Sequence, residues 1–159
     1  MQPMPTADEA RHMTENHDCL IAVCDALEAV ADSLPHNVDR QQCLLLSRAL
    51  GPLLYRAQEL EETQVFPTLL RLNRPRLDIA GTIDRLRIEH QIDLCYAEEV
   101  QEMLKSYGEG RQDIAPDAAG FMLRGFFECL RRHIAFEQEL LAPLLELAVR
   151  GKPAAMALN

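Results

Sequence analysis

Residues 126–144 read FFECLRRHIAFEQELLAPL, and this stretch indicates the fold class. Its apolar side chains recur at intervals of three or four residues, which is the period of an α-helix that buries one face. His133 and Glu137 stand within that apolar stripe, one helical turn apart. Because ionisable side chains are rarely buried without a partner, we expect this helix to carry chemistry as well as packing.

Three further segments share the helical period. Gly and Pro are sparse in this chain of 159 residues, and they gather in short groups between the periodic segments. The pattern predicts helices over residues 7–34, 39–72, 82–107 and 117–150. No alternating strand pattern competes with them, so the expected fold class is all-α. Short connections between long helices predict an up-down-up-down antiparallel four-helix bundle.

Local signals set the expected ends of these helices. Thr6 and Glu9 form a Thr-x-x-Glu capping box at the first start. Gly51 and Pro52 predict a kink or a short break in the second helix, and residues 73–76 form the loop that follows it. The other ends are marked by Pro35, Gly108, Pro116, Gly151 and Pro153.

Composition and charge limit the number of domains and the class of partner. With 48% hydrophobic residues the chain buries one sizeable core, so we expect residues 1–159 to form a single domain with its bundle over about residues 7–150. A formal net charge of −9 repels phosphate backbones and anionic lipids, so nucleic acid and membranes are not expected partners. The chain shows no membrane span and no secretory signal, which predicts a cytoplasmic protein.

Five cysteines form an odd set without CxxC spacing, which suits neither a disulfide framework nor a structural zinc site. We expect reduced thiols buried in helices. Cys24 and Cys129 fall on the same stripes as His17 and His133, and core filling is the expected role of both.

Each apolar stripe contains a residue of the wrong polarity near its middle. A single buried histidine is more often a core residue than a ligand, and a single glutamate can extend to solvent. Several such residues on four inward faces need a common explanation, because burying a charge costs several kcal/mol unless it is paired or binds metal. The sequence therefore predicts a metal site formed by His17, Glu61, His90, His133 and Glu137.

Other polar residues are expected at the surface. His12 lies about 140° from His17 around the helix. His36 falls in a turn, and Glu59 and Glu62 are assigned to a solvated acidic face.

The second and fourth helices also resemble each other. Residues 57–67, AQELEETQVFP, align without gaps on residues 133–143, HIAFEQELLAP, so that Glu61 matches Glu137 and Pro67 matches Pro143. On these residues the sequence resembles the hemerythrin-like, HHE cation-binding family. The pattern of that family places a histidine, HxxxE, a histidine and HxxxE on successive helices. The resemblance spans about residues 10–150.

The resemblance implies a hemerythrin-like bundle, and it assigns the same five residues as ligands. The histidine of the second helix falls on Ala57, so one ligand of the pattern is missing. In the family two glutamates bridge two irons, histidines complete the coordination, and an open position takes oxygen, nitric oxide or water. The implied cofactor is one or two iron ions, and the ligands also suit zinc or manganese. The ferritin-like class needs a pair of Glu-x-x-His elements, and this pair is absent.

Three functions remain open at this point. The first is a module that senses or handles oxygen, nitric oxide or iron, and the sequence favours it. The second is a di-iron oxidoreductase or an enzyme of iron-sulfur repair. The third is a metal-free helical scaffold in which the change at Ala57 has ended metal binding.

Overall fold

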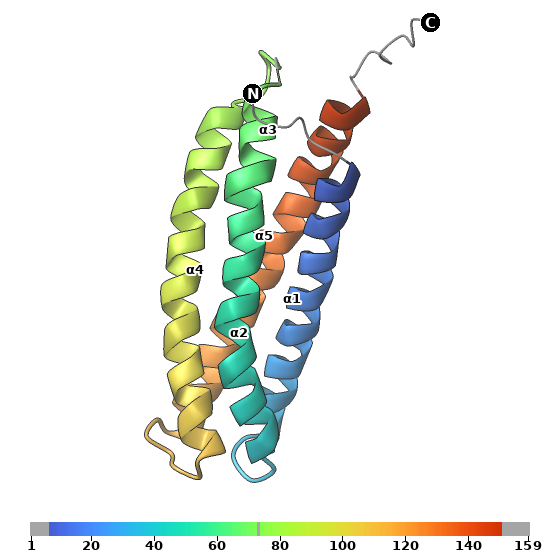
Figure 1. Ribbon diagram of the computed structural model, residues 1–159. Coiled ribbons are helices and arrows are strands. Elements are labelled where there is room, and N and C mark those ends of the chain that lie inside the picture. Colours follow the sequence, from blue (N-terminus) through green and yellow to red (C-terminus); the bar gives the residue numbers. More distant parts are fainter. Residues whose placement is uncertain (1–6, 73, 151–159) are drawn as a thin grey trace, which may run out of the picture.

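The computed structural model describes residues 7–72 and 74–150, and every regular element in these residues is helical (Figure 1). In chain order the elements are α1 (Ala7–Ser33), α2 (Arg40–Leu60), η1 (Glu61–Val65), α3 (Phe66–Leu70), α4 (Ile79–Gly108) and α5 (Pro116–Arg150). The element η1 is a π-helical segment, and α2, η1 and α3 follow one another without a gap. The described residues therefore form four rods, and the all-α prediction is confirmed.

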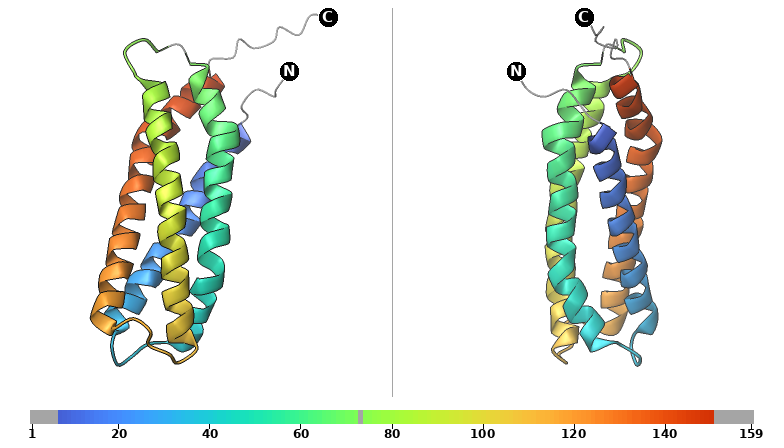
Figure 2. Two further views of the ribbon diagram at one scale, coloured as in Figure 1. Left: turned by 90° about the vertical axis from the view of Figure 1, so that its left-hand side faces the viewer. Right: turned by 45° about the vertical axis from the view of Figure 1, so that its right-hand side comes forward.

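The four rods run alternately up and down, as Figures 1 and 2 show. α1 packs against α2 and α5, and α4 packs against the same two helices. Each rod thus has two neighbours and turns one face to a shared interior. The predicted up-down-up-down antiparallel bundle is confirmed. No helix in the described part of the chain is both long enough and apolar enough to cross a membrane.

Side-chain caps explain where two of the helices begin. The Asp39 carboxylate accepts a hydrogen bond from the backbone N–H of Gln42 at 3.1 Å, at the start of α2. Asp78 accepts from the N–H of Gly81 at 2.9 Å, so α4 begins at Ile79 rather than at the predicted residue 82. The predicted capping residue Thr6 lies outside the described residues.

Of the kink or short break predicted at Gly51 and Pro52, the break is wrong, because α2 runs through both residues. A Cβ atom at position 51 would lie 2.5 Å from the side-chain oxygen of Gln101 on α4. Gln101 in turn donates a hydrogen bond to the carbonyl of Ser47 at 3.1 Å. The glycine therefore permits a close approach between α2 and α4, and it does not end the helix.

The π-helical segment η1 was not predicted. Its backbone N–H at Phe66 donates to the carbonyl of Glu61, five residues earlier. The next residue, Pro67, has no N–H, and its ring would clash with a carbonyl four residues back in a regular α-helix. The wider turn before Pro67 accommodates the ring, and it includes Glu61, one of the predicted ligands.

The core consists of two apolar clusters on either side of a polar layer. On α1 the order is Met13 in the smaller cluster, then His17, then Leu20 in the larger cluster. On α5 it is Ile134 in the larger cluster, then Glu137, then Leu141 in the smaller one. The predicted ligands are thus held in a dry interior, where electrostatic interactions are strong.

The prediction that all cysteines are buried is wrong for three of them. All five are free thiols, and Cys24 and Cys43 are buried while Cys19, Cys95 and Cys129 are exposed. The stripe of α5 is centred on Phe126, Phe127 and Leu130, so Cys129 falls just outside it. Cys24 fills the core as predicted.

Candidate metal centre

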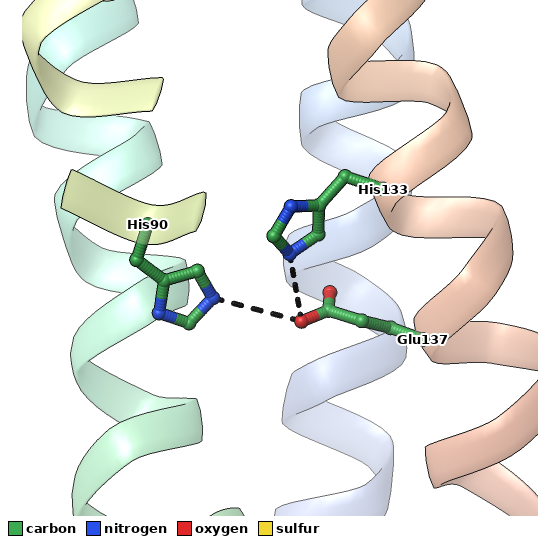
Figure 3. Close-up of side chains that lie close together, drawn as sticks. All are labelled: His90, His133 and Glu137. Atoms are coloured by element: carbon green, nitrogen blue, oxygen red, sulfur yellow. Dashed lines mark hydrogen bonds and ion pairs between the residues drawn. The ribbon is translucent and has the colours of Figure 1, made fainter. Parts of the chain in front are cut away.

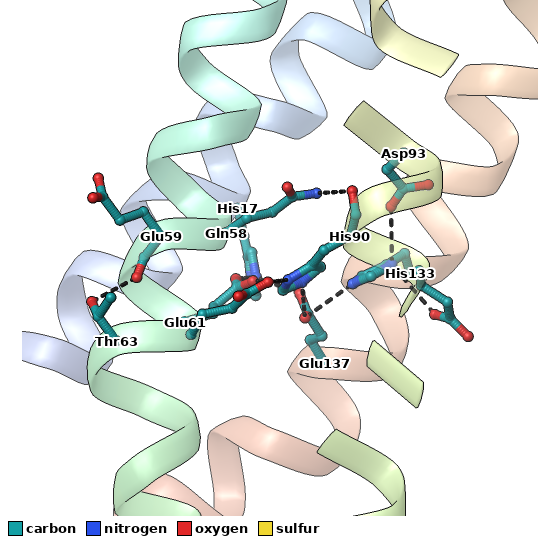
Figure 4. A network of polar contacts seen from close by, with 11 residues as sticks. His17, Gln58, Glu59, Glu61, Thr63, His90, Asp93, His133 and Glu137 are labelled. Atoms are coloured by element: carbon teal, nitrogen blue, oxygen red, sulfur yellow. Dashed lines mark hydrogen bonds and ion pairs between the residues drawn. The ribbon is translucent and has the colours of Figure 1, made fainter. Parts of the chain in front are cut away.

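The five predicted ligands meet in one buried layer across the bundle (Figure 4). α1 supplies His17, η1 supplies Glu61, α4 supplies His90, and α5 supplies His133 with Glu137. Each of these side chains is at most 9% exposed. The residues that interrupt four apolar stripes therefore converge on one buried layer, and their role as metal ligands stays a prediction.

Glu137 contacts all three of the buried histidines. Its Oε1 atom lies 3.0 Å from His133 Nε2 and 3.6 Å from His90 Nε2 (Figure 3). Its Oε2 atom lies 3.0 Å from His17 Nε2, on the other side of the carboxylate. One carboxylate thus faces two separate groups of imidazoles.

Glu61 has the same two-sided arrangement. Its Oε1 atom lies 3.0 Å from His17 Nε2, and its Oε2 atom lies 3.2 Å from His90 Nε2. Both carboxylates therefore present one oxygen to His17 and the other to the opposite side. The potential ligand atoms form two groups, each within 4.8 Å: His17, Glu61 and Glu137 in one, and His90, His133 and Glu137 in the other.

The outward nitrogens of two histidines face acidic residues. His90 Nδ1 lies 2.7 Å from Glu62 Oε1, so the assignment of Glu62 to a purely solvated face is wrong. His133 Nδ1 lies 3.2 Å from Asp93 Oδ2 and 3.4 Å from Glu89 Oε2. The surface assignments of His12, His36 and Glu59 agree with the structure, where all three are exposed.

Sequence reasoning did not identify these outer residues. Asp93 lies three residues after His90 on the buried side of α4, so an acid in an apolar stripe was a signal that could have found it. Glu62 and Glu89 are adjacent in sequence to a ligand, at positions where acidic residues are common on solvated helix faces.

The protonation of the three histidines depends on these carboxylates. Burial by itself lowers a histidine pKa, but the facing carboxylates outweigh burial here. Contacts with Glu137 and Glu61 raise the pKa of His17 to about 9. The pKa of His90 and that of His133 are each raised to about 10. Burial raises the pKa of Glu137, yet its three histidine contacts hold it well below the usual range. Without metal, the raised pKa values favour protonated imidazoles in this layer at neutral pH.

An aromatic stack shields one side of the layer. The rings of Phe66 and His90 are stacked with centroids 5.6 Å apart, and His90 and His133 are stacked at 5.3 Å. Phe66 begins α3 directly after η1, so the backbone of the π-helical segment positions the ring that stacks on His90. The stack restricts the rotation of both imidazoles.

The residues present fit a bound metal cation. Imidazole nitrogens and carboxylate oxygens are suitable ligands for iron, zinc and manganese. His90 Nε2 is buried and forms no hydrogen bond of its own within the described residues, although it lies 3.2 Å from Glu61 Oε2 and 3.6 Å from Glu137 Oε1. The layer encloses a cavity of about 10 Å³, close to the space of one water molecule. Ala57 also lines this cavity, and its methyl side chain offers no ligand atom.

Comparison with known protein families identifies the class to which this bundle and its site belong. The family model for the hemerythrin HHE cation binding domain matches residues 8–145. The chain therefore belongs to the hemerythrin HHE cation-binding family, and it carries His and Glu clusters arranged to bind a cation. No curated protein and no solved structure matches the chain.

Proposed function

We propose that the protein is a non-haem iron module with a two-ion centre that senses or handles oxygen, nitric oxide or iron. One observation carries the proposal: Glu61 and Glu137 each direct one oxygen at His17 and the other at His90. A carboxylate that faces two ligand groups is suited to bridge two cations. Both carboxylates are buried, so their charges need compensation of this kind.

The two ligand groups differ in the number of imidazoles that they contain. His90 and His133, with one oxygen of Glu137, would supply three ligand atoms to one ion, and Glu61 Oε2 lies 3.2 Å from His90 Nε2. His17, with the other two oxygens, supplies three to the second ion. Ala57, where the family pattern has a histidine, lines the cavity and offers no ligand atom, which favours an open coordination position in the centre. Bound iron would supply reversible binding of a small diatomic ligand at such a position.

Apolar side chains around the polar layer limit what can enter the site. Leu20, Leu54, Leu130 and Ile134 line the cavity beside the polar layer and limit its space to a very small ligand.

The free thiols of the five cysteines favour a reducing compartment, such as the cytoplasm. The net charge of −9 disfavours nucleic acid and anionic membranes as partners.

The assignment of His17 as an iron ligand is tested with two histidines of α1, of which His17 is buried and His12 is exposed. The wild type, His17→Ala and the matched surface variant His12→Ala are reconstituted anaerobically with Fe²⁺, and bound iron is measured by elemental analysis. We expect two irons in the wild type and in His12→Ala, and fewer in His17→Ala. Equal iron in all three variants would contradict the assignment of His17.

The sensing role has its own measurement. The iron-loaded protein is exposed to nitric oxide or oxygen, and the absorption spectrum is followed before and after the gas is removed. A reversible change supports sensing, whereas multiple turnovers with an added reductant support the oxidoreductase alternative. A protein that retains no iron, and whose stability does not change with a chelator, is a scaffold.

A further inference from the structure

We infer that Glu62 and Asp93 are positioning residues that make the two metal positions unequal. The position of His90 and His133 binds the first ion tightly, and the position of His17 binds a second ion that exchanges readily. This inference rests on the proposed two-ion centre. It identifies which of the two ions would respond to the metal supply.

Glu62 orients the imidazole of His90. Its Oε1 atom lies 2.7 Å from His90 Nδ1, within the range of a charge-assisted hydrogen bond. A neutral His90 that donates from Nδ1 to this carboxylate leaves the lone pair of Nε2 free for a metal. The Nε2 atom faces Glu61 and Glu137 (Figure 4), so the ring is held with its ligand atom toward the centre.

Asp93 has the corresponding position beside His133. Its carboxylate is only 7% exposed, and its Oδ2 atom lies 3.2 Å from His133 Nδ1. Glu89 reaches the same nitrogen from a half-exposed position, with a separation of 3.4 Å. The opposite nitrogen of His133 lies 3.0 Å from Glu137 Oε1. His133 therefore lies between outer acids and a bridging acid, as His90 does, but in the described part of the chain only His90 has a hydrogen bond to its outer acid.

His17 lacks such support. Its Nδ1 atom is buried and has no hydrogen-bond partner among residues 7–72 and 74–150. Its only polar contacts within that part of the chain are through Nε2, with Glu61 and Glu137. Ala57, which lines the cavity of the layer, supplies no further imidazole. One position thus has two oriented imidazoles, and the other has one imidazole without an outer partner.

These differences favour an order of filling. Loss of an outer hydrogen-bond partner of a metal-binding histidine typically weakens metal affinity by about 10- to 100-fold. Within the described residues, one such hydrogen bond acts on the position of His90 and His133, from Glu62 to His90, and the Asp93 carboxylate adds an ion-pair contact to His133. No outer acid contacts the His17 imidazole there. We therefore expect two separate binding constants, and only the weaker one should fall in a range where the ion exchanges with its surroundings.

The experiment is an anaerobic stepwise titration of the metal-free protein with Co²⁺, followed by absorption, and repeated with Fe²⁺. The variants Glu62→Leu and Asp93→Leu should weaken the first step by roughly tenfold or more and leave the second step unchanged. Glu62→Gln retains an oxygen that can accept from His90 Nδ1, so it should restore part of the loss. Glu59→Gln, an exposed neighbour on the same rod, is the matched control and should bind as the wild type does.

Ala57→His tests the other position. An added imidazole should strengthen the second step alone. Circular dichroism and thermal unfolding establish that each variant is folded, and Glu62→Gln replaces Glu62→Leu if the latter does not fold.

The outcomes separate the inference from the function on which it rests. Two equal constants, or an equal loss in both steps with Glu62→Leu, overturn the inference while the two-ion centre stands. A single ion whose affinity depends on Glu62 and Asp93 overturns the two-ion centre but supports the positioning role. A single ion that is indifferent to both residues, or no bound ion at all, overturns both.

Discussion

At the scale of single residues, the geometry of the polar layer sets the pKa values of its histidines. Glu137 touches three imidazoles, and each of these imidazoles has a raised pKa. An unfolded chain has no such contacts, and its histidines titrate near 6.5. Folding and metal binding are therefore both linked to protons, with opposite effects on the same three side chains.

The first prediction concerns the stability of the metal-free protein. Groups whose pKa is higher in the folded state contribute stability that is fully present below the unfolded value and is lost as pH rises through the folded value. The free energy of unfolding should therefore fall between about pH 6.5 and pH 10. Urea unfolding with a chelator present measures this change. Stability that is constant or rises across this range would contradict the protonated layer.

The second prediction concerns metal uptake at neutral pH. A metal must displace protons from imidazoles whose pKa is about 9 or 10, so binding should release protons and tighten as pH rises. Calorimetric titrations with Zn²⁺ at pH 7.5, in buffers of different ionisation enthalpy, count the protons released. An enthalpy that does not depend on the buffer would mean that the histidines are not displaced from their ion pairs.

At this scale the sequence was informative where a polar residue stands in an apolar stripe. His17 and His90 stand in apolar stripes, so their burial and their partnership could be predicted from periodicity. Glu62 and Glu89 could not be distinguished from ordinary surface acids, because only the packing of α4 against its neighbours brings them to a histidine. Asp93 carried a signal in its buried stripe, and it was overlooked.

At the scale of elements, the rod from Arg40 to Leu70 contains the least predictable feature of the molecule. Its length follows from helical periodicity, whereas the π-helical segment depends on Pro67 and on the fit of Phe66 against His90. Pro143 occupies the matching position of α5, and that helix stays regular. Two segments that share the glutamate and the proline of the repeat therefore adopt different backbone conformations.

The third prediction follows from this pair of prolines. Pro67→Ala restores an N–H at position 67, so the regular α-helical pattern becomes available and Glu61 should rotate away from the centre. We expect metal affinity to fall several-fold, measured by the Co²⁺ titration. Pro143→Ala is the matched control, because α5 has no π-helical segment near Pro143. Equal affinity in both variants would mean that Pro67 does not maintain the π-helical turn.

At the scale of the whole molecule, the bundle is a dry core on both sides of a polar layer. The larger cluster packs the half of the bundle near the α1–α2 connection, and the smaller one packs the half that contains α3 (Figure 1). All-α periodicity, short loops and composition were sufficient to predict this architecture. The packing that decides which cysteines are buried could not be predicted in the same way, as Cys129 shows.

The fourth prediction tests the core itself. Leu50 is fully buried in the larger cluster, so Leu50→Ala should lower the free energy of unfolding by about 2–5 kcal/mol. Leu45 on the same helix is 60% exposed, and Leu45→Ala should change it by less than about 0.5 kcal/mol. Urea unfolding monitored by circular dichroism compares the two variants. Similar losses at both positions would contradict the described burial.

The most direct test of the central claim is an anomalous difference map from crystals of the protein grown with Fe²⁺. The proposed centre predicts two peaks inside the bundle, one beside His90 and His133 and the other beside His17, with Glu61 and Glu137 between them. A single peak would contradict the bridging role of the two carboxylates. Peaks only at the protein surface would contradict the metal centre as a whole.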